Sequence, residues 1–154
     1  MLNIVLYNPE IPPNTGNIIR LCAITGFALH LIEPLGFAMD DKKLRRAGLD
    51  YRESQRVLVH DHWQAFVDSI APRRIFAIST SGQNHYHKID FVPGDTLVFG
   101  AETRGLPKSF LAQLSPSAVL RVPMLPDNRS LNLSNTVAIV AYEAWRQQGF
   151  AGAV

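Results

Sequence analysis

The sequence predicts an α/β fold, with a mostly parallel β-sheet and helices on both of its faces. Apolar strand-like runs alternate with helix-like segments about every 20 to 25 residues, and the strand cores are continuously apolar, as in sheets covered on both sides. The chain has 154 residues, 47% of them hydrophobic. This length allows one compact core and leaves little room for a second. We therefore expect residues 1–154 to form a single domain.

The first half of the chain contains three predicted strands and three predicted helices. A β-rich run over residues 2–7 leads into a proline-stiffened loop over residues 8–14. Apolar residues then recur with helical spacing from Thr15 to Gly26, and Asn14 or Thr15 is available as the N-cap. The other elements are a strand over 27–33, a charged, exposed helix over 40–48, a strand over 57–59 and a helix over 61–71.

The second half predicts strands over residues 74–80, 96–100 and 118–123 and a short helix over 109–114. The strand over 74–80 runs into a polar loop that extends to residue 87. Three strand ends carry polar segments, at residues 79–82, 100–105 and 124–135. Because ligands of parallel sheets bind beyond the carboxyl ends of the strands, these segments predict one shared ligand site.

The last predicted helix, over residues 136–145, is apolar nearly all round. A helix without a polar face has to be covered on more than one side. In a chain of this size, that pattern predicts a subunit interface. Tyr142 either reaches the partner's site or is an ordinary interface or core tyrosine.

Bulk properties exclude some settings. The net charge of +2 and the pI of about 8.9 are compatible with a nucleic-acid partner but do not require one. The single cysteine, Cys22, cannot form an internal disulfide, so we expect a small buried residue and a reducing, cytoplasmic setting. No apolar run approaches the ~18 residues that cross a bilayer, so no membrane partner is predicted.

Several motifs of common enzyme classes are missing. The sequence has no Gly-x-Gly-x-x-Gly after the first strand, no Gly-Lys-Ser/Thr phosphate loop, no His-Glu-x-x-His and no Cys-x-x-Cys. His85 and His87 are spaced to share a metal, but no third ligand is recognisable and a solvated loop is the preferred interpretation. We therefore predict no metal.

Three longer segments carry a family resemblance. They are Asn14-Thr-Gly-Asn-Ile-Ile-Arg20, Leu97-Val-Phe-Gly-Ala-Glu-Thr-Arg-Gly-Leu-Pro107, and Val122-Pro-Met124 with Asn128-Arg-Ser-Leu-Asn-Leu-Ser-Asn135. In sequence, order and spacing they resemble the three motifs of the SPOUT RNA 2'-O-ribose methyltransferases. The likeness covers essentially the whole chain. The lack of an RNA-binding extension resembles the smallest members, which methylate wobble position 34 of certain leucine tRNAs on cytidine or a modified uridine.

The resemblance implies S-adenosylmethionine as methyl donor, tRNA as substrate, a homodimer, and a trefoil knot in the C-terminal third of the chain. Knots are otherwise nearly absent from proteins, so the knot is expected from the family alone. Two alternatives stay open. One is a ribosomal-RNA 2'-O-methyltransferase of the same fold, and the other is a non-catalytic homologue that binds RNA or cofactor.

The resemblance also implies site residues. Arg20 matches the arginine proposed to activate the ribose hydroxyl. Because a guanidinium hardly ever loses its proton, we expect it to grip the target phosphate and stabilise the alkoxide instead; its alternative is a surface ion pair. The other implied catalytic residues are Asn14, Glu102, Ser130 and Asn132. Asn14 would orient Arg20 or the ribose, and Glu102 would hold Asn14 or Arg20; helix capping or simple solvation are the alternatives.

For the cofactor, the resemblance implies that the three loops wrap one ligand. The implied cofactor-binding residues are Ile78, Ser79, Thr80, Gly100, Glu102, Gly105, Val122, Met124, Ser130, Leu131 and Asn135. Gly100 and Gly105 would let the backbone approach the cofactor closely, or are merely turn glycines.

For RNA, the best candidate surface is a basic cluster over residues 42–56, although a solvated helix is a serious rival. Its members are Lys42, Lys43, Arg45, Arg46, Arg52 and Arg56. The other candidate RNA-binding residues are Arg20, Arg104, Lys108, Arg129 and Tyr142.

Overall fold

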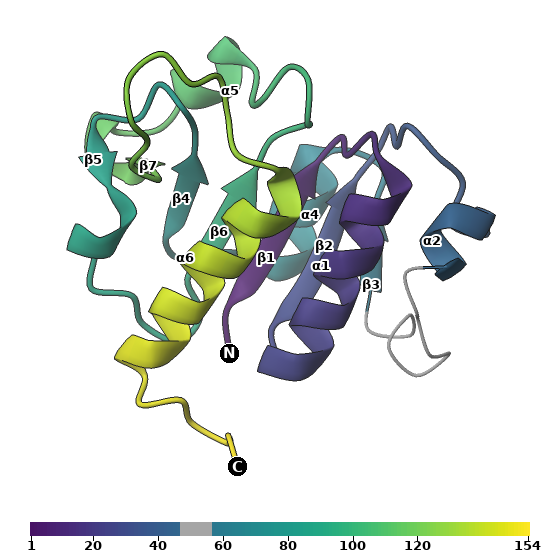
Figure 1. Cartoon of the computed structure of the whole chain (residues 1–154), viewed down its shortest axis with the longest axis horizontal. Helices are drawn as coiled ribbons and strands as arrows, with labels where there is room; N and C mark the ends of the chain where they lie inside the picture. Colours follow the sequence, from purple (N-terminus) through teal and green to yellow (C-terminus); the bar gives the residue numbers. More distant parts are fainter. Residues whose placement is uncertain (47–56) are drawn as a thin grey trace.

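A computed structural model describes residues 1–46 and 57–154 of the chain (Figure 1). The described residues form a seven-stranded sheet in the order β3-β2-β1-β6-β4-β7-β5, and every strand pair is parallel. The strands are β1 (Asn3–Tyr7), β2 (Ala28–Ile32), β3 (Val57–His60), β4 (Ile75–Ile78), β5 (Asn84–His85), β6 (Thr96–Phe99) and β7 (Val119–Arg121). The predicted α/β class with a parallel sheet is confirmed.

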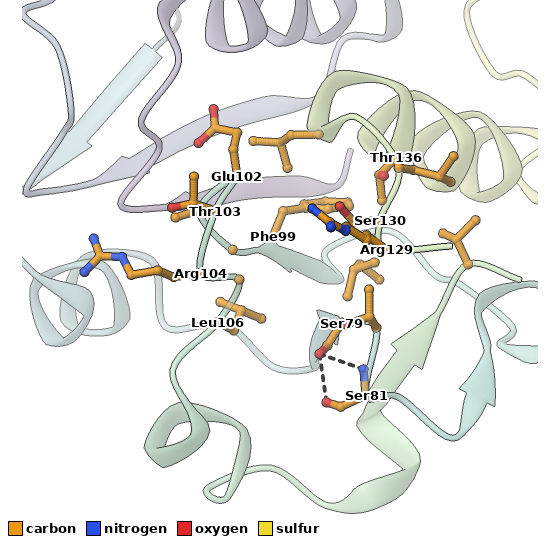
Figure 2. A pocket seen from close by; sticks show the side chains of 18 of the residues that line it. Ser79, Ser81, Phe99, Glu102, Thr103, Arg104, Leu106, Arg129, Ser130 and Thr136 are labelled. Atoms are coloured by element: carbon orange, nitrogen blue, oxygen red, sulfur yellow. Dashed lines mark hydrogen bonds between the residues drawn. The ribbon is translucent and has the colours of Figure 1, made fainter. Parts of the chain in front are cut away.

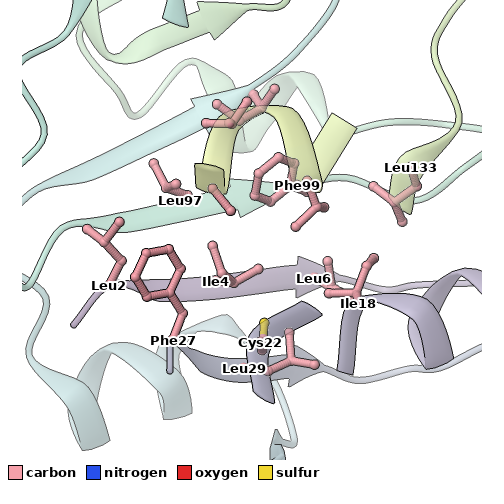
Figure 3. Close-up of a cluster of buried hydrophobic side chains, with 14 of the residues drawn as sticks. Leu2, Ile4, Leu6, Ile18, Cys22, Phe27, Leu29, Leu97, Phe99 and Leu133 are labelled. Carbon is pink, nitrogen blue, oxygen red and sulfur yellow. The ribbon is translucent and has the colours of Figure 1, made fainter. Parts of the chain in front are cut away.

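Helices cover both faces of this sheet (Figure 1). They are α1 (Pro12–Thr25), α2 (Lys42–Arg46), α4 (Trp63–Ile70), α5 (Lys108–Leu111) and α6 (Leu133–Gln147). Helices α1 and α6 pack on one face against buried side chains of β1, β2 and β6 (Figure 3). Phe66 of α4 and Phe110 of α5 pack on the other face. No described helix has the length and apolar character that a membrane span requires.

Cys22 lies inside the first of these clusters, as predicted. It is 5% exposed, and burial raises the pKa of its thiol to about 12. Since the thiolate is the reactive form, this cysteine is an inert packing residue.

The start of α1 differs from the prediction. The helix begins at Pro12, before the expected Thr15, and its N-cap is Ile11 rather than Asn14 or Thr15. The two prolines occupy the first helical positions, where no backbone N–H is needed and the proline φ already suits a helix. The side chain of Asn14 is therefore available for contacts outside the helix. Gly26 ends the helix in the left-handed conformation, as expected.

Other helix and strand boundaries also differ from the predicted ones. Helix α6 begins at Leu133 rather than at residue 136, because Asn132 caps it. The predicted helix over 40–48 corresponds to α2, which begins at Lys42. Residues 47 and 48 of the prediction lie outside the described part of the chain. Strand β5 falls inside the predicted polar loop, because a two-residue strand of Asn84 and His85 has no apolar pattern to reveal it.

A buried polar chain links four strands. His30 of β2 is 1% exposed, and its Nε2 lies 3.2 Å from Oδ1 of Asn3, which can only accept. In the neutral ring, Nδ1 of His30 therefore accepts from Nε2 of His60, 3.0 Å away. Asn3 in turn donates to Thr96 at 3.4 Å. Burial, and then the neighbouring His60, lower the pKa of His30 from 6.5 to about 4.

We expect this chain to make stability depend on pH. Between the unfolded pKa of 6.5 and the folded pKa of about 4, the unfolded state binds a proton that folded His30 does not. Unfolding free energy should therefore fall as pH drops from 7 to 5, with a slope approaching about 1.4 kcal/mol per pH unit. The pKa of His60, also lowered by burial, adds to the same trend. Urea unfolding at pH 7, 6 and 5 measures the slope. An equal slope in His30→Gln would contradict this assignment.

Candidate active site

A cavity of about 730 Å³ lies at the carboxyl ends of β4, β6 and β7. Residues 78–81 and 99–106 line it, together with Arg121, Val122, Met124 and residues 129–133 and the beginnings of α1 and α6. Figure 2 shows side chains from these separate segments facing one space. The three polar loops thus lie around one cavity, and its volume is in the range of cofactor pockets.

A hydrogen-bond chain beside this cavity joins the turn after β6, the beginning of α1 and the loop after β7. The carboxylate of Glu102 accepts from the backbone N–H groups of Glu10 and Ile11, at 2.7 and 3.0 Å, and from Nδ2 of Asn14 at 3.4 Å. Oδ1 of Asn14 accepts from Nδ2 of Asn132 at 3.0 Å. Asn14 is 6% exposed and uses both ends of its amide, so its orientation is fixed.

The N-terminus of α6 borders the cavity. Oδ1 of Asn132 caps the helix by accepting from the backbone N–H of Asn135 at 3.3 Å, and it also accepts from the hydroxyl of Ser134. Capping and the link to Asn14 thus coexist in one side chain. Ser130, Leu133 and Thr136 line the cavity near this end. A helix N-terminus favours negatively charged groups, such as a ligand carboxylate.

Cations surround the cavity. Its described lining includes four basic side chains, Arg104, Lys108, Arg121 and Arg129, and one acidic side chain, Glu102. Four positive charges against one negative charge leave this lining with a net positive charge. The cavity mouth therefore attracts anions, and a polyanion most of all.

The turn after β6 is a tight hairpin in which Ala101 pairs with Gly105. A Cβ at Gly100 would lie 2.2 Å from the carbonyl carbon of Gly105, and Gly105 itself has φ +64°. Both positions thus require glycine for the hairpin itself. This is the turn interpretation, and close approach of a ligand is not needed to explain either residue.

The loop after β4 is held by its own serines (Figure 2). Oγ of Ser79 lies 2.9 Å from Oγ of Ser81 and accepts from the backbone N–H of Ser81 at 3.2 Å. The backbone N–H of Ser79 donates to the carbonyl of Leu120 in β7 at 2.9 Å. This wall of the cavity is therefore fixed to the neighbouring strand.

Most of the predicted cofactor-binding residues lie in the cavity wall. Ten of the eleven line it, and Asn135, in the first turn of α6, does not. Of the predicted catalytic residues, Asn14, Glu102, Ser130 and Asn132 line the cavity. Arg20 does not, because it lies farther along α1 with its side chain exposed.

The predicted RNA-binding residues separate into two groups. Arg104, Lys108 and Arg129 line the cavity. Lys42, Lys43 and Arg46 are exposed on α2, on the β3 side of the sheet and away from α5 and β7 (Figure 1). Tyr142 is 41% exposed on α6. Arg45 belongs to α2, and Arg52 and Arg56 lie outside the described residues.

The residues near the cavity that the sequence did not single out include Arg121, Thr103 and Glu10. Arg121 lines it because it ends β7 and points away from the buried Leu120, a signal that strand alternation offers. Thr103 also lines it, and Glu10 contacts Thr103; nothing in their local sequence reveals this. His85 and His87 have rings 5.6 Å apart, and the described residues contain no group of three or more potential metal ligands.

Comparison with known proteins gives consistent matches. The model of the SpoU rRNA methylase family matches residues 1–142. A tRNA (cytidine(34)-2'-O)-methyltransferase of Saccharophagus degradans is 60% identical, covering 99% of both chains. The protein of that name from Escherichia coli K12 is also 60% identical, covering 100% of this chain and 98% of its own. A solved structure described as giving insights into the 2-OH methylation of C/U34 on tRNA superposes with a TM-score of 0.90, at 45% identity over 97% of both chains.

Proposed function

The chain belongs to the SpoU rRNA methylase family, and we propose that it methylates the ribose 2'-hydroxyl at wobble position 34 of tRNA. The observation that carries this proposal is the 60% identity, over essentially the full chain, to tRNA (cytidine(34)-2'-O)-methyltransferases. The substrates would be leucine tRNAs in the cytoplasm, with cytidine or a modified uridine at the target. The family description names ribosomal RNA, which makes a ribosomal target the second candidate.

The methyl donor is S-adenosylmethionine. Residues 78–81, 99–106 and 129–133 would hold it, with Arg121, Val122 and Met124. The N-terminus of α6 suits the donor's carboxylate. When bound, the donor supplies an electrophilic methyl group. The protein then has to align the ribose hydroxyl with that methyl and remove the hydroxyl proton.

Asn14, Glu102 and Asn132 form a fixed polar wall beside the donor. Because both ends of the Asn14 amide are engaged, its role is to position groups rather than to move protons. Arg20 is unsuited to be a base, since a guanidinium keeps its proton. We assign it to the target phosphate, whose negative charge it would hold beside the reacting ribose.

The cations of the cavity mouth are the proposed contacts for the wobble nucleotide and its neighbours. Arg104, Arg121 and Arg129 line the cavity, whereas α2 lies at the β3 end of the sheet, away from α5 and β7 (Figure 1). We propose that Lys42, Lys43 and Arg46 contact a more distant part of the tRNA.

We also propose a homodimer that associates through α6. One side of this helix is buried against α1 and the sheet, yet Ile139 and Tyr142 are 37% and 41% exposed. These residues continue the apolar character of the helix onto its open side. A second subunit would remove them from water.

The knot implied by the family is a further proposal. In its support, β7 lies between β4 and β5, and a Cβ at Gly82 would come within 2.6 Å of the Leu120 backbone. The loop after β4 thus crosses tightly against β7. An experimental trace of residues 75–140 checks whether the chain threads that loop.

The function is tested with methyl-labelled donor, total small RNA and ribosomal RNA. We expect label on the 2'-oxygen of nucleotide 34 of leucine tRNAs, located by nucleotide mapping. Label in ribosomal RNA or on a base would reject the tRNA proposal. Donor binding without any transfer would favour a non-catalytic homologue.

Arg20→Ala should lower methyl transfer by at least about 100-fold, because the target ribose loses its anchoring charge. The dissociation constant for S-adenosylmethionine should change little, since Arg20 does not line the cavity. Single-turnover kinetics and calorimetry measure the two quantities. A parallel loss of both would show that Arg20 is structural.

Ile139→Glu should dissociate the dimer, because it places a charge in an apolar interface. Sedimentation equilibrium should report a change from twice the chain mass of 17.1 kDa to that mass. Leu58→Glu, at a 48% exposed position of the edge strand β3, is the control and should stay dimeric. A wild-type monomer at micromolar concentration would refute the interface.

A further inference from the structure

Glu10, in the loop before α1, and Glu102, in the turn after β6, each bind a group of the other's loop. The carboxylate of Glu102 accepts from the backbone N–H groups of Glu10 and Ile11, at 2.7 and 3.0 Å. In return, the carboxylate of Glu10 accepts from the hydroxyl of Thr103, which lies 2.8 and 2.9 Å from its two oxygens. The two loops are therefore joined in both directions, although they lie about 90 positions apart, the Glu10–Glu102 bond spanning 92.

The Glu10 side chain is not arranged for stability. Only 26% of it is exposed, and Nε of Arg104, its charged neighbour, is 3.9 Å away on a side chain that is 78% exposed. Such a pair contributes little. Its close side-chain partner is a neutral hydroxyl, and withdrawing a carboxylate from water for that partner costs free energy. A role in positioning accounts for the arrangement.

The loop that contains Gly36 also contacts the backbone around Glu10. The N–H of Gly36 donates to the carbonyl of Pro9 at 2.9 Å. A Cβ at Gly36 would lie 2.8 Å from Cα of Glu10, so the two loops touch. With Glu102 on one side and Gly36 on the other, Glu10 has little freedom to shift.

This junction connects the two halves of the site. Helix α1, which carries Asn14 and Arg20, begins two residues after Glu10. The hairpin of residues 101–105, which carries Thr103, lines the cavity, and Figure 2 shows Glu102 and Thr103 adjacent on it. Any slippage between the loops would move ribose-side groups relative to the methyl donor.

We propose that Glu10 is a positioning residue for methyl transfer. Through Thr103 it fixes α1 against the hairpin, and so fixes the target hydroxyl relative to the donor methyl. This inference rests on the proposed function. Its premise is that transfer is sensitive to alignment, where a displacement of ~1 Å costs on the order of 100-fold in rate.

Two pairs of variants test the bond from both ends. Glu10→Ala removes the acceptor and Thr103→Val removes the donor, whereas Glu10→Gln and Thr103→Ser each keep a hydrogen-bonding group. We expect the first two to lower kcat at least about 10-fold and to change the S-adenosylmethionine dissociation constant less than about 3-fold. The conservative variants should retain most of kcat. Asp68→Ala, at an exposed site on α4, is the control and should match the wild type.

The double variant Glu10→Ala with Thr103→Val should be no slower than the slower single variant, because both changes remove one bond. Additive losses would overturn the proposal. So would an unchanged kcat in either single variant, or a cofactor affinity that falls in parallel with kcat.

Amide hydrogen exchange gives a readout that does not depend on activity. Glu10→Ala and Thr103→Val should both speed exchange in peptides over 8–20 and over 99–106, while peptides of α4 stay unchanged. Unaltered exchange would overturn the proposal. The wild type could leave tRNA unmethylated while the variants still show this exchange pattern. That result would reject the proposed function but support the contact between Glu10 and Thr103.

Discussion

The hydrogen-bond chain from Glu102 through Asn14 to Asn132 is the constraint on which the site depends. A parallel sheet brings the ends of β4, β6 and β7 to one edge, but it does not fix the loops beyond them. Here the turn after β6 contributes Glu102, α1 contributes Asn14 and the loop after β7 contributes Asn132. Glu102 also binds the backbone at the start of α1, and Asn132 caps α6. The cavity wall is thereby rigid before any ligand arrives, which is what an alignment-limited reaction requires.

Sequence patterns predicted the elements that depend on the residues of one short segment. Buried strands such as β1 and β6 are apolar runs, and Gly26 ends α1 as glycine ends many helices. Strand β5 could not be predicted, because its two residues are polar and form a strand only by pairing with β7. The residues expected to bind the cofactor were predicted by resemblance, and ten of the eleven line one cavity. The exposed position of Arg20, and the contact of Glu10 with Thr103, follow from tertiary packing that no local pattern encodes.

One helix serves two purposes. The N-terminus of α6 borders the cavity through Asn132, while its later turns expose Ile139 and Tyr142. A continuous helix transmits a displacement along its whole length, because its backbone hydrogen bonds keep it stiff. A partner that binds the later turns of α6 would therefore also displace or hold the N-cap beside the cavity. In the proposed homodimer, association would therefore be coupled to ligand binding.

The place of β7 in the sheet has a consequence for how the protein is made. Strands β1, β2, β3, β4 and β6 all precede residue 100 and form a continuous set, whereas β7 is inserted between β4 and β5. A ribosome releases the chain from its N-terminus, so this first set can pair while the remainder is still being synthesised. The last wall of the cavity then arrives with residues 119–133. A truncated chain can consequently hold a sheet and still have no place to bind a ligand.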